Sequence, residues 1–369
     1  MSLKIESITL ERFRAFRELT IHGLGRVNLI TGKNNTGKSS VLEGLRLLVN
    51  KAAPDEIYDI LRYREENIGE EEEEGHPTDP DSLLLVSGLF HGFPLLAEDP
   101  EPISISTSGK PIPMSMTMCL DWRSAELDLD GKRRWIPLDK LDPDGIAALV
   151  VDREGTTNVY PLERFRYPYS MRRGRFEPSD ETRMSCIFVS PYGGGGTGML
   201  GALWDKIALS DREKDVVEAL RIIDSQISAV AMIGSTRRRP TAIVRANNIE
   251  RPIPLRSFGD GLNRLFGIIL SLVNARGGLL LVDEFENGLH HTVQLDVWRT
   301  IFQLAQTLDI QVFATSHSWD AVEAFQKAAA EAPEEGVLIR LAHRGEDIIP
   351  TVLSEDELAI ATRDEIEVR

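Results

Sequence analysis

The sequence predicts an α/β fold of the P-loop NTPase type, in which the two ends of the chain form one domain. Two motifs and one contrast between segments support this prediction. A glycine-rich loop, Gly32 to Ser39, stands between a strand-like and a helix-like segment near the N-terminus. Far along the chain, a second apolar strand ends in the adjacent carboxylates Asp283 and Glu284. The long segment between these motifs has a different pattern, so we expect an insertion there.

The N-terminal elements follow from hydrophobic periodicity. Residues 5–13 and 16–21 are strand-like, and 27–31 is a short apolar strand that runs into a glycine. An amphipathic helix is expected over 38–50, because its apolar residues repeat at helical spacing on one side. These four elements predict the start of a compact α/β unit.

The expected insertion, 61–249, begins with acidic residues concentrated in 65–81, a composition typical of a solvated linker or flexible loop. A helix is expected from about residue 199. Another is expected behind Ser210 to Glu213, which have capping-box spacing, with apolar residues repeating as far as Ile227. Short strands are expected at 83–90, 103–106, 114–122, 134–138 and 147–151.

The α/β pattern returns at about residue 251. We expect a helix, a buried strand at 278–282, a helix, a strand at 310–315, a helix, two strands and a last helix capped at Ser354. The sequence therefore predicts that residues 1–60 and 250–369 form one nucleotide-binding domain.

Composition narrows the possible functions. The 369 residues are 42% hydrophobic and 27% charged, which is typical of a soluble protein with a real core. No apolar run approaches the roughly 18 residues of a membrane span, and no signal stretch opens the chain, so we expect a cytoplasmic protein without membrane contact. The net charge of -16 means that any DNA contact needs a local basic patch. Cys119 and Cys186 lack metal-site spacing and are expected to be reduced in a core.

The glycine-rich loop has the two glycines, lysine and hydroxyl residue of a phosphate-binding loop. Its glycines let backbone N–H groups curl around a β-phosphate, and the following helix adds its positive end. Lys38 would reach the β- and γ-phosphates, and the Ser39 hydroxyl would ligate Mg²⁺. The alternative is a strand-to-helix turn with an incidental lysine, which the flanking strand and helix disfavour.

The two carboxylates at 283 and 284 are costly at the end of a buried strand unless a cation meets them. Mg²⁺ held with Ser39 would do so, with Asp283 as a water-mediated metal contact and Glu284 as the base that orients the attacking water. The alternative is an ordinary acidic strand end. His317 follows the next buried strand and could sense the γ-phosphate, although a lone histidine there is more often structural.

A second helix N-terminus suits an anion. Ser257-Phe258-Gly259-Asp260-Gly261 precedes an amphipathic helix about twenty residues before the acidic strand end. Serine and aspartate are also ordinary N-caps, so only the position of this segment in the chain favours its interpretation as an anion site.

The order of these motifs resembles the ABC-type ATPases of the SMC/RecF/OLD group, and most of all the OLD-like AAA family ATP-binding proteins of prokaryotes. The likeness covers about the first 50 and the last 120 residues. Residues 286–290 look like the D-loop, and 8–16 look like the first strand of the family. The resemblance implies that ATP and Mg²⁺ bind between two head domains of a homodimer.

By this resemblance the Walker A residues are Gly32, Asn34, Asn35, Thr36, Gly37, Lys38, Ser39 and Ser40. The signature residues acting in trans are Ser257, Gly259, Asp260 and Gly261; Asp283 and Glu284 belong to Walker B, and His317 is the switch histidine.

The resemblance is incomplete in two places. No glutamine stands where a Q-loop can be placed. The 52 residues after His317 are too few for the TOPRIM nuclease that OLD-type proteins often carry. Paired acids occur at Asp79 and Asp81, Asp128 and Asp130, and Asp142 and Asp144, but their surroundings favour turns or linkers.

Three segments of the insertion are ambiguous. Arginines and aromatics interleave in 164–176, which suits nucleic acid but also suits a surface loop paired with acidic residues. Arg237 to Arg239 has the same two interpretations. Gly193 to Gly196 indicates a flexible loop, since no lysine–hydroxyl pair follows it.

These observations favour an ATP-hydrolysing switch that dimerises around ATP and controls a partner effector, such as a separate nuclease or toxin, or a nucleic-acid transaction, plausible in phage defence or a toxin–antitoxin system. One alternative is a RecF-like repair ATPase, although such chains do not resemble 286–290 or His317. The other is a non-hydrolysing scaffold stabilised by ATP, against which Glu284 argues.

Overall fold

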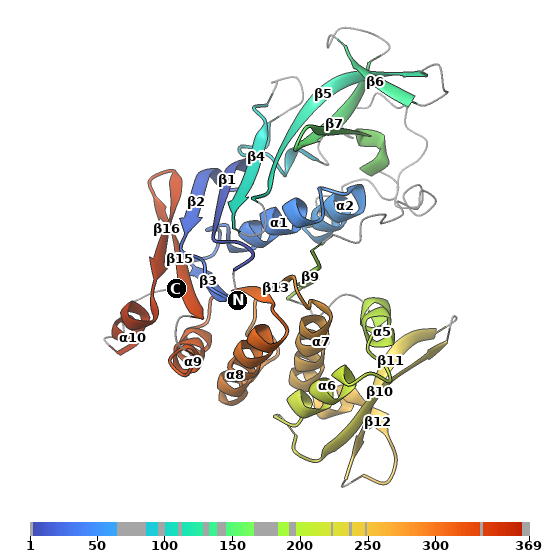
Figure 1. The fold of residues 1–369 in the computed structure, drawn as a ribbon, viewed down its shortest axis with the longest axis vertical. Helices are drawn as coiled ribbons and strands as arrows, with labels where there is room; N and C mark the ends of the chain where they lie inside the picture. Colours follow the sequence, from blue (N-terminus) through green and yellow to red (C-terminus); the bar gives the residue numbers. More distant parts are fainter. Residues whose placement is uncertain are drawn as a thin grey trace.

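The described part of the chain folds into three β-sheets with helices between and around them (Figure 1). A computed structural model gives this fold. It describes residues 3–64, 86–94, 100–109, 113–127, 133–138, 145–165, 184–191, 197–222, 224–235, 238–247, 249–332 and 335–363.

The central sheet is mostly parallel and has the strand order β16-β15-β3-β14-β13-β9, with only β16 antiparallel. All residues of β3, β13 and β14 are buried, as their continuous apolar runs predict. The strands are β3 (Val27–Gly32), β9 (Cys186–Val189), β13 (Leu279–Val282), β14 (Gln311–Thr315), β15 (Gly336–Arg344) and β16 (Asp347–Leu353).

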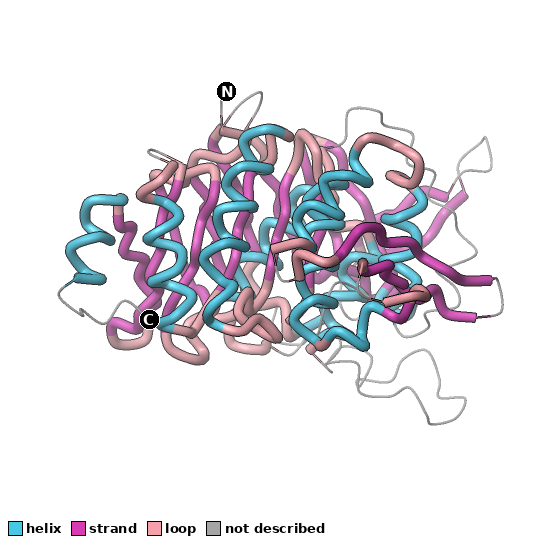
Figure 2. The backbone as a smooth tube through the Cα atoms, turned by 90° about the horizontal axis from the view of Figure 1, so that it is seen from below, coloured by secondary structure: helices cyan, strands magenta, loops and turns pink. Residues whose placement is uncertain are grey.

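Helices cover both faces of this central sheet. Helix α1 (Lys38–Val49) packs on one face, and α7 (Asp260–Asn274), α8 (His291–Thr307) and α9 (Trp319–Ala329) pack on the other (Figures 1 and 2). Alternate residues of β13 therefore enter two different cores: Leu279 and Leu281 face α1, while Leu280 and Val282 face α7 and α8. Helix α10 (Glu355–Arg363) follows β16.

A second, antiparallel sheet lies on the far side of α1, so that α1 is held between two sheets (Figure 1). Its order is β2-β1-β4-β5-β7-β8, with β6 also paired to β5. Helix α2 (Pro54–Tyr63) follows α1 and packs in the same core. The strands are β1 (Ser7–Phe13), β2 (Phe16–His22), β4 (Ile103–Ser108), β5 (Ser115–Leu127), β6 (Arg133–Pro137), β7 (Ile146–Arg153) and β8 (Thr156–Pro161).

A third, small sheet packs beside α7. It contains β10 (Ile227–Ser235), β11 (Arg238–Ala246) and β12 (Ile253–Pro254), all antiparallel. Helices α5 (Thr197–Asp205) and α6 (Arg212–Leu220) lie between it and α7 and share its core (Figure 1). Short 3₁₀ helices follow β8 at Leu162–Phe165 and precede α7 at Leu255–Phe258.

The predicted α/β P-loop fold with an ABC-type head is confirmed, including the element order after residue 251. The predicted cap of the last helix also forms, because the Ser354 N–H and hydroxyl both donate to Glu357 Oε2. The predicted strand at 83–90 is wrong for its described part: Val86 and Ser87 carbonyls accept turn hydrogen bonds from Leu89 and Phe90. The helices predicted from about residue 199 and after Ser210 form as α5 and α6, but α6 ends at Leu220, and Ile227, predicted as part of the helical repeat, begins β10.

Two further expectations are corrected in detail. The Glu213 carboxylate accepts from the Leu209 N–H, so the predicted box with Ser210 does not form. Both cysteines are half-buried, and Cys186 packs against the core that includes α1 instead of lying inside it. The expected insertion is also interleaved with the chain ends, because β4 pairs with β1 and β9 pairs with β13. The division at residues 60 and 250 stays a prediction.

Several predicted features lie outside the described residues. These are the acidic run 65–81, the acid pairs at 79 and 81, 128 and 130, and 142 and 144, the glycines 193–196, Arg237, and the arginine–aromatic segment from 166 onward. Among the helices that are described, none is both long and apolar enough to cross a membrane.

Candidate nucleotide-hydrolysis site

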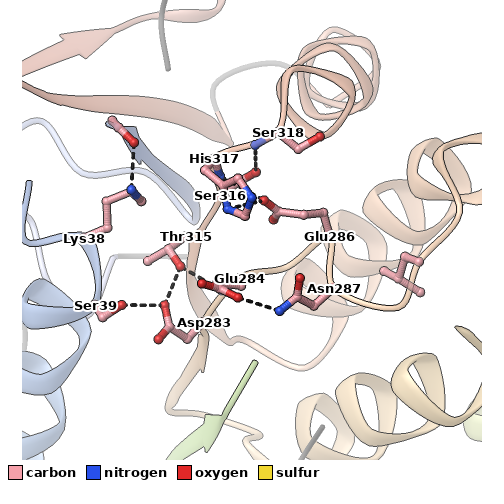
Figure 3. Close-up of polar contacts among 12 residues, drawn as sticks. Lys38, Ser39, Asp283, Glu284, Glu286, Asn287, Thr315, Ser316, His317 and Ser318 are labelled. Atoms are coloured by element: carbon pink, nitrogen blue, oxygen red, sulfur yellow. Dashed lines mark hydrogen bonds and ion pairs between the residues drawn. The ribbon is translucent and has the colours of Figure 1, made fainter. Parts of the chain in front are cut away.

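The predicted phosphate-binding loop connects β3 to α1 in the expected way (Figure 3). Gly37 caps α1 with a φ of 79°, and a Cβ there would lie 2.5 Å from Cζ of Phe16, so the loop fits only glycine at this position. The Lys38 ammonium crosses back over the loop and donates to the Gly32 carbonyl at 2.7 Å and to the Lys33 carbonyl at 3.0 Å. Burial lowers the pKa of Lys38, while Asp283, Glu286 and Glu284 act in the opposite direction.

A hydroxyl–carboxylate contact joins the phosphate-binding loop to the end of β13. The Ser39 hydroxyl donates to Asp283 Oδ1 at 2.9 Å, and the Thr315 hydroxyl donates to the same oxygen at 2.6 Å. Asp283 is only 2% exposed. Burial raises the pKa of this carboxyl, although the hydrogen bonds from Thr315 and Ser39 lower it.

These oxygen donors fit a hard cation. Mg²⁺ is commonly bound by one or two protein oxygens together with substrate phosphates, and Ser39 and Asp283 supply such a pair beside the lysine. The described residues contain no group of three or more His, Cys, Asp or Glu side chains that would form an all-protein metal site. The donor set therefore suits a metal that arrives with a phosphate chain.

Glu284 is held in a strained conformation beside Asp283. Its φ is 46°, in the left-handed region that non-glycine residues seldom adopt. Its N–H donates to the Thr315 hydroxyl at 2.8 Å, and its carboxylate oxygen Oε2 accepts from Asn287 Nδ2 at 2.5 Å. Such strain is often found at functional sites, and here both ends of the residue are fixed.

His317 follows β14 and faces the same region (Figure 3). Its backbone N–H and its ring Nδ1 both lie within hydrogen-bond distance of Glu286 Oε1, at 2.9 Å and 3.1 Å. The Glu286 side chain is 9% exposed, whereas the histidine ring is 52% exposed. The carboxylate thus fixes one ring nitrogen and leaves the other side of the ring accessible.

A cleft of about 600 Å³ gathers these groups. Most of the predicted Walker residues line it, together with His317 and with groups that sequence reasoning did not select. Its predicted lining residues are Asn34, Asn35, Thr36, Gly37, Lys38, Ser39, Ser40, Asp283, Glu284 and His317. The further lining residues are Arg14, Ala15, Arg64, His91, Gly92, Phe93, Thr315, His343 and Ile348, while Gly32 stands at the end of β3 just behind the loop.

A buried ion-pair network supports the loop from behind. Glu43, on α1, accepts from Arg14 Nε at 3.0 Å and from Arg64 Nε at 2.7 Å. Arg64 also donates to the Ser40 hydroxyl at 3.3 Å. The Arg14 and Glu43 side chains are 3% and 6% exposed. The β1–β2 turn, α1 and the end of α2 are therefore fastened together beside the cleft.

Arg264 of α7 ties that helix to the catalytic strand end. Its guanidinium donates to the carbonyls of Asp283 at 2.8 Å and Glu284 at 3.1 Å, and also to the Ser190 carbonyl. Burial lowers the pKa of Arg264 to about 10, with the nearby carboxylates opposing the shift. The sequence feature that could have identified Arg264 is its position as a single arginine in a helix that is otherwise apolar on nearly every side.

The predicted signature residues lie apart from the cleft. Ser257 is exposed in the turn before α7, and Gly259 is exposed with a φ of 103°. Gly261 packs against the loop after β13, since a Cβ there would lie 2.9 Å from the Gly288 carbonyl. The Asp260 side chain is outside the described residues. Among the described residues lining the cleft, none comes from 257–261.

Two family models match the sequence. Residues 194–322 match the model described as "AAA domain, putative AbiEii toxin, Type IV TA system", and residues 3–83 match the model described as "AAA ATPase domain". The chain is an ATPase. In each match the boundaries include one half of the nucleotide site, with Lys38 in the second model and Glu284 in the first.

Two curated proteins and a solved structure are similar to this chain. The chain is 23% identical over 356 residues to an ATP/GTP phosphatase of Helicobacter pylori, with 89% of each chain covered. It is 50% identical over 46 residues to the uncharacterized protein MJECL10 of Methanocaldococcus jannaschii, covering 12% of this chain and 21% of that protein. A solved SMC head domain, bound to the C-winged helix domain of ScpA, is similar with a TM-score of 0.52 and 10% identity, covering 95% of this chain and 98% of that one. The last likeness shows an SMC-like, ABC-type head fold.

Proposed function

We propose that this ATPase is a Mg²⁺-dependent switch whose two catalytic carboxylates act on ATP held by the phosphate-binding loop. The observation that carries the proposal is the 2.9 Å contact from Ser39 to Asp283, because it joins the two halves of the site across the central sheet. Lys38, Asp283 and Glu284 then line one cleft with His317. This arrangement supports a site in which a cation, a metal-binding pair and a base act on one phosphate.

Each side chain has a distinct task in this proposal. Lys38 exchanges its two carbonyl acceptors for phosphate oxygens, and the loop N–H groups bind the β-phosphate. Ser39 and Asp283 would hold Mg²⁺, which neutralises charge on the phosphates when bound. Glu284 takes the proton of the attacking water, and its Asn287 contact keeps the carboxylate aimed. His317, whose Nδ1–H donates to Glu286, donates its Nε2–H to the γ-phosphate in the doubly protonated, imidazolium form.

We further propose that ATP is shared between two copies of the chain. Within one chain, the γ-phosphate end of the cleft is lined by Walker residues and His317, while Ser257 and Gly259 are exposed elsewhere. A second copy can bring these residues and the N-terminus of its own α7 to the phosphate. ATP binding then stabilises a two-fold dimer with two composite sites.

The biological role we propose is control of a separate effector, a nuclease or toxin, in phage defence or a toxin–antitoxin system, as in OLD-like proteins. The match of 194–322 to a toxin–antitoxin family model supports this role over a RecF-like repair ATPase. In this proposal the switch acts through the effector, and DNA is a second candidate partner.

Turnover and nucleotide binding of single variants test the site. Glu284→Gln should still bind ATP but turn over at least about a hundredfold more slowly, the scale expected for loss of a general base. Lys38→Ala should weaken ATP binding itself. Glu323→Gln and Lys327→Ala are matched controls, because these two residues pair with each other on α9 and are half-exposed. Near-normal turnover of Glu284→Gln would remove the proposed base.

A further inference from the structure

A short segment from the expected insertion, residues 86–94, forms one wall of the nucleotide cleft. It is docked on the β1–β2 hairpin by the Arg14 N–H to the Leu89 carbonyl at 2.9 Å and by the His91 N–H to the Arg12 carbonyl at 2.9 Å. Phe90 pairs with Phe13 as an isolated bridge and is 1% exposed. The segment is thus anchored by a buried aromatic side chain immediately before the residues that face the cleft.

The next aromatic residue behaves in the opposite way. Phe93 lines the cleft and is 66% exposed, although Phe90, three residues earlier, is fully buried. Its φ is 52°, directly after Gly92 at 81°. A bulky residue in the left-handed region is a genuine conformational outlier, and such outliers cluster at ligand-binding positions. The backbone accepts strain here while the ring stays exposed to the cleft.

His91 adds a polar group on the same wall. Its Nδ1 lies 3.0 Å from the Arg14 carbonyl oxygen, and a carbonyl can only accept, so Nδ1 carries the proton. In the neutral ring, Nε2 is then a hydrogen-bond acceptor. An acceptor can pair with the exocyclic amine of adenine but not with the carbonyl oxygen that guanine has at the equivalent position.

The phosphates limit where the nucleoside can lie. Their γ end is at Asp283, Glu284 and His317, so the nucleoside extends from the loop toward one of two walls. One wall lies beyond Ser40, where Arg64 and Arg14 share Glu43 and lead to His91 and Phe93. The other wall lies at the loop tip, where His343 Nε2 is 3.3 Å from the Asn35 carbonyl oxygen. Among the described residues that line the cleft, the exposed phenyl ring of Phe93 belongs to the first of these walls.

We infer that Phe93 stacks on the base of the bound nucleotide and that His91 Nε2 selects adenine by accepting from its amine. This inference rests on the proposed function, because it takes the phosphate position from the Walker residues. Stacking of a base on an aromatic side chain is typically worth a factor of about ten in affinity. The selective element therefore comes from the segment that follows the phosphate-binding domain's first two helices.

Calorimetry with three ligands tests the inference. Dissociation constants are measured with Mg²⁺ for ATP, GTP and inorganic tripolyphosphate, which has the phosphates but no base. Phe93→Ala should raise the dissociation constant of ATP about tenfold and change that of tripolyphosphate by no more than about twofold. Leu209→Ala is the matched control, because Leu209 is 99% exposed and also left-handed, with a φ of 63°, but lies outside the cleft. His91→Phe should weaken the binding of ATP and leave the binding of GTP nearly unchanged, so that the protein no longer prefers ATP over GTP.

A second variant gives an independent signal. Phe93→Trp should show tryptophan fluorescence that ATP quenches and tripolyphosphate does not. Unchanged ATP affinity in Phe93→Ala, or equal weakening of ATP and tripolyphosphate, overturns the inference. Selective loss of ATP binding in His343→Ala overturns it too, because the base would then lie on the opposite wall. Weak binding of both ATP and tripolyphosphate by the wild type would instead overturn the proposed function and the inference with it.

Discussion

Glu286 holds His317 by two contacts to a single oxygen: the backbone N–H of the histidine donates at 2.9 Å, and its ring Nδ1 lies at 3.1 Å (Figure 3). The glutamate is two residues beyond Glu284, so one short loop after β13 carries both the proposed base and the group that orients the histidine. The loop itself packs against α7, since Gly288 approaches Gly261 closely. A shift of α7 would therefore displace both Glu284 and His317.

Removing the Glu286 carboxylate should slow turnover without weakening ATP binding, because Glu286 fixes His317 and does not line the cleft itself. We expect kcat to fall about tenfold in Glu286→Gln and further in Glu286→Ala. The measurement is steady-state turnover beside ATP affinity. On a His317→Ala background, Glu286→Ala should add little, since coupled residues are not additive. Full additivity would mean that Glu286 acts by another route.

The buried Asp283 carboxyl should reduce the stability of the nucleotide-free protein at neutral pH. Its pKa is raised, so the folded chain keeps this proton to a higher pH than the unfolded chain does. The free energy of unfolding therefore decreases as pH rises through the window between the ordinary aspartate pKa and the raised one. Asp283→Asn keeps an oxygen for Ser39 and Thr315 and removes the charge.

We accordingly expect Asp283→Asn to raise the melting temperature at pH 7.5 by about 2 °C and to abolish Mg²⁺-dependent ATP binding. The gain over wild type should be smaller at pH 5, because lowering the pH protonates more of the wild-type carboxyl, whose pKa burial raises. Thermal melts at both pH values, with EDTA present, provide the check. A lower melting temperature for the variant at every pH would contradict the electrostatic explanation.

The Glu43 network should matter far more to stability than a surface ion pair. Glu43→Ala leaves the buried Arg14 guanidinium without its carboxylate, which typically costs about 3–5 kcal/mol. The matched control is Glu346→Ala, which removes one of the two carboxylates that pair with Arg17. The Glu346 and Arg17 side chains are 88% and 60% exposed, so this change should cost less than about 1 kcal/mol. Urea unfolding of both variants measures the difference. Equal losses would show that Glu43 is not a structural centre of the loop.

The parts of the site that could be predicted are those encoded by local patterns. A strand, a glycine-rich loop and a helix fix where Lys38 and Ser39 lie, and the carboxyl ends of neighbouring parallel strands bring Asp283 to them. His317 follows from the same rule, one strand along. These predictions needed only the order of elements and the geometry of a parallel sheet.

The rest depends on contacts between segments that are distant in sequence. The apolar run 83–90 suits a strand, and short apolar runs do not reveal their structure by periodicity. Its described part turns because Leu89 and His91 exchange backbone hydrogen bonds with the β1–β2 hairpin. Phe93 faces the cleft only as a result of that docking. The role of Arg264 could not be predicted either, because the three carbonyls that accept from its guanidinium belong to segments distant in sequence.

Assembly gives the most discriminating prediction, because it tests the whole arrangement of motifs at once. Ser257 is exposed and lies outside the cleft of its own chain, so Ser257→Arg should leave ATP binding to the single chain unchanged. In a composite site, the bulky side chain would instead enter the interface near the partner's bound ATP. We therefore expect this variant to lose turnover and ATP-dependent dimerisation together.

Mixing two inactive variants should then restore part of the activity. Lys38→Ala lacks the loop lysine but has an intact Ser257, whereas Ser257→Arg has the reverse defect. A heterodimer of the two contains one site with both defects and one site with neither, so turnover should recover toward about a quarter of the wild-type value if the subunits mix freely and the sites act independently. Sedimentation with and without ATP is run on each variant and on the mixture, and Lys327→Ala serves as the unaffected control. Full activity of Ser257→Arg alone would mean that one chain completes its own site, because a residue required only in trans cannot be dispensable in a homogeneous variant.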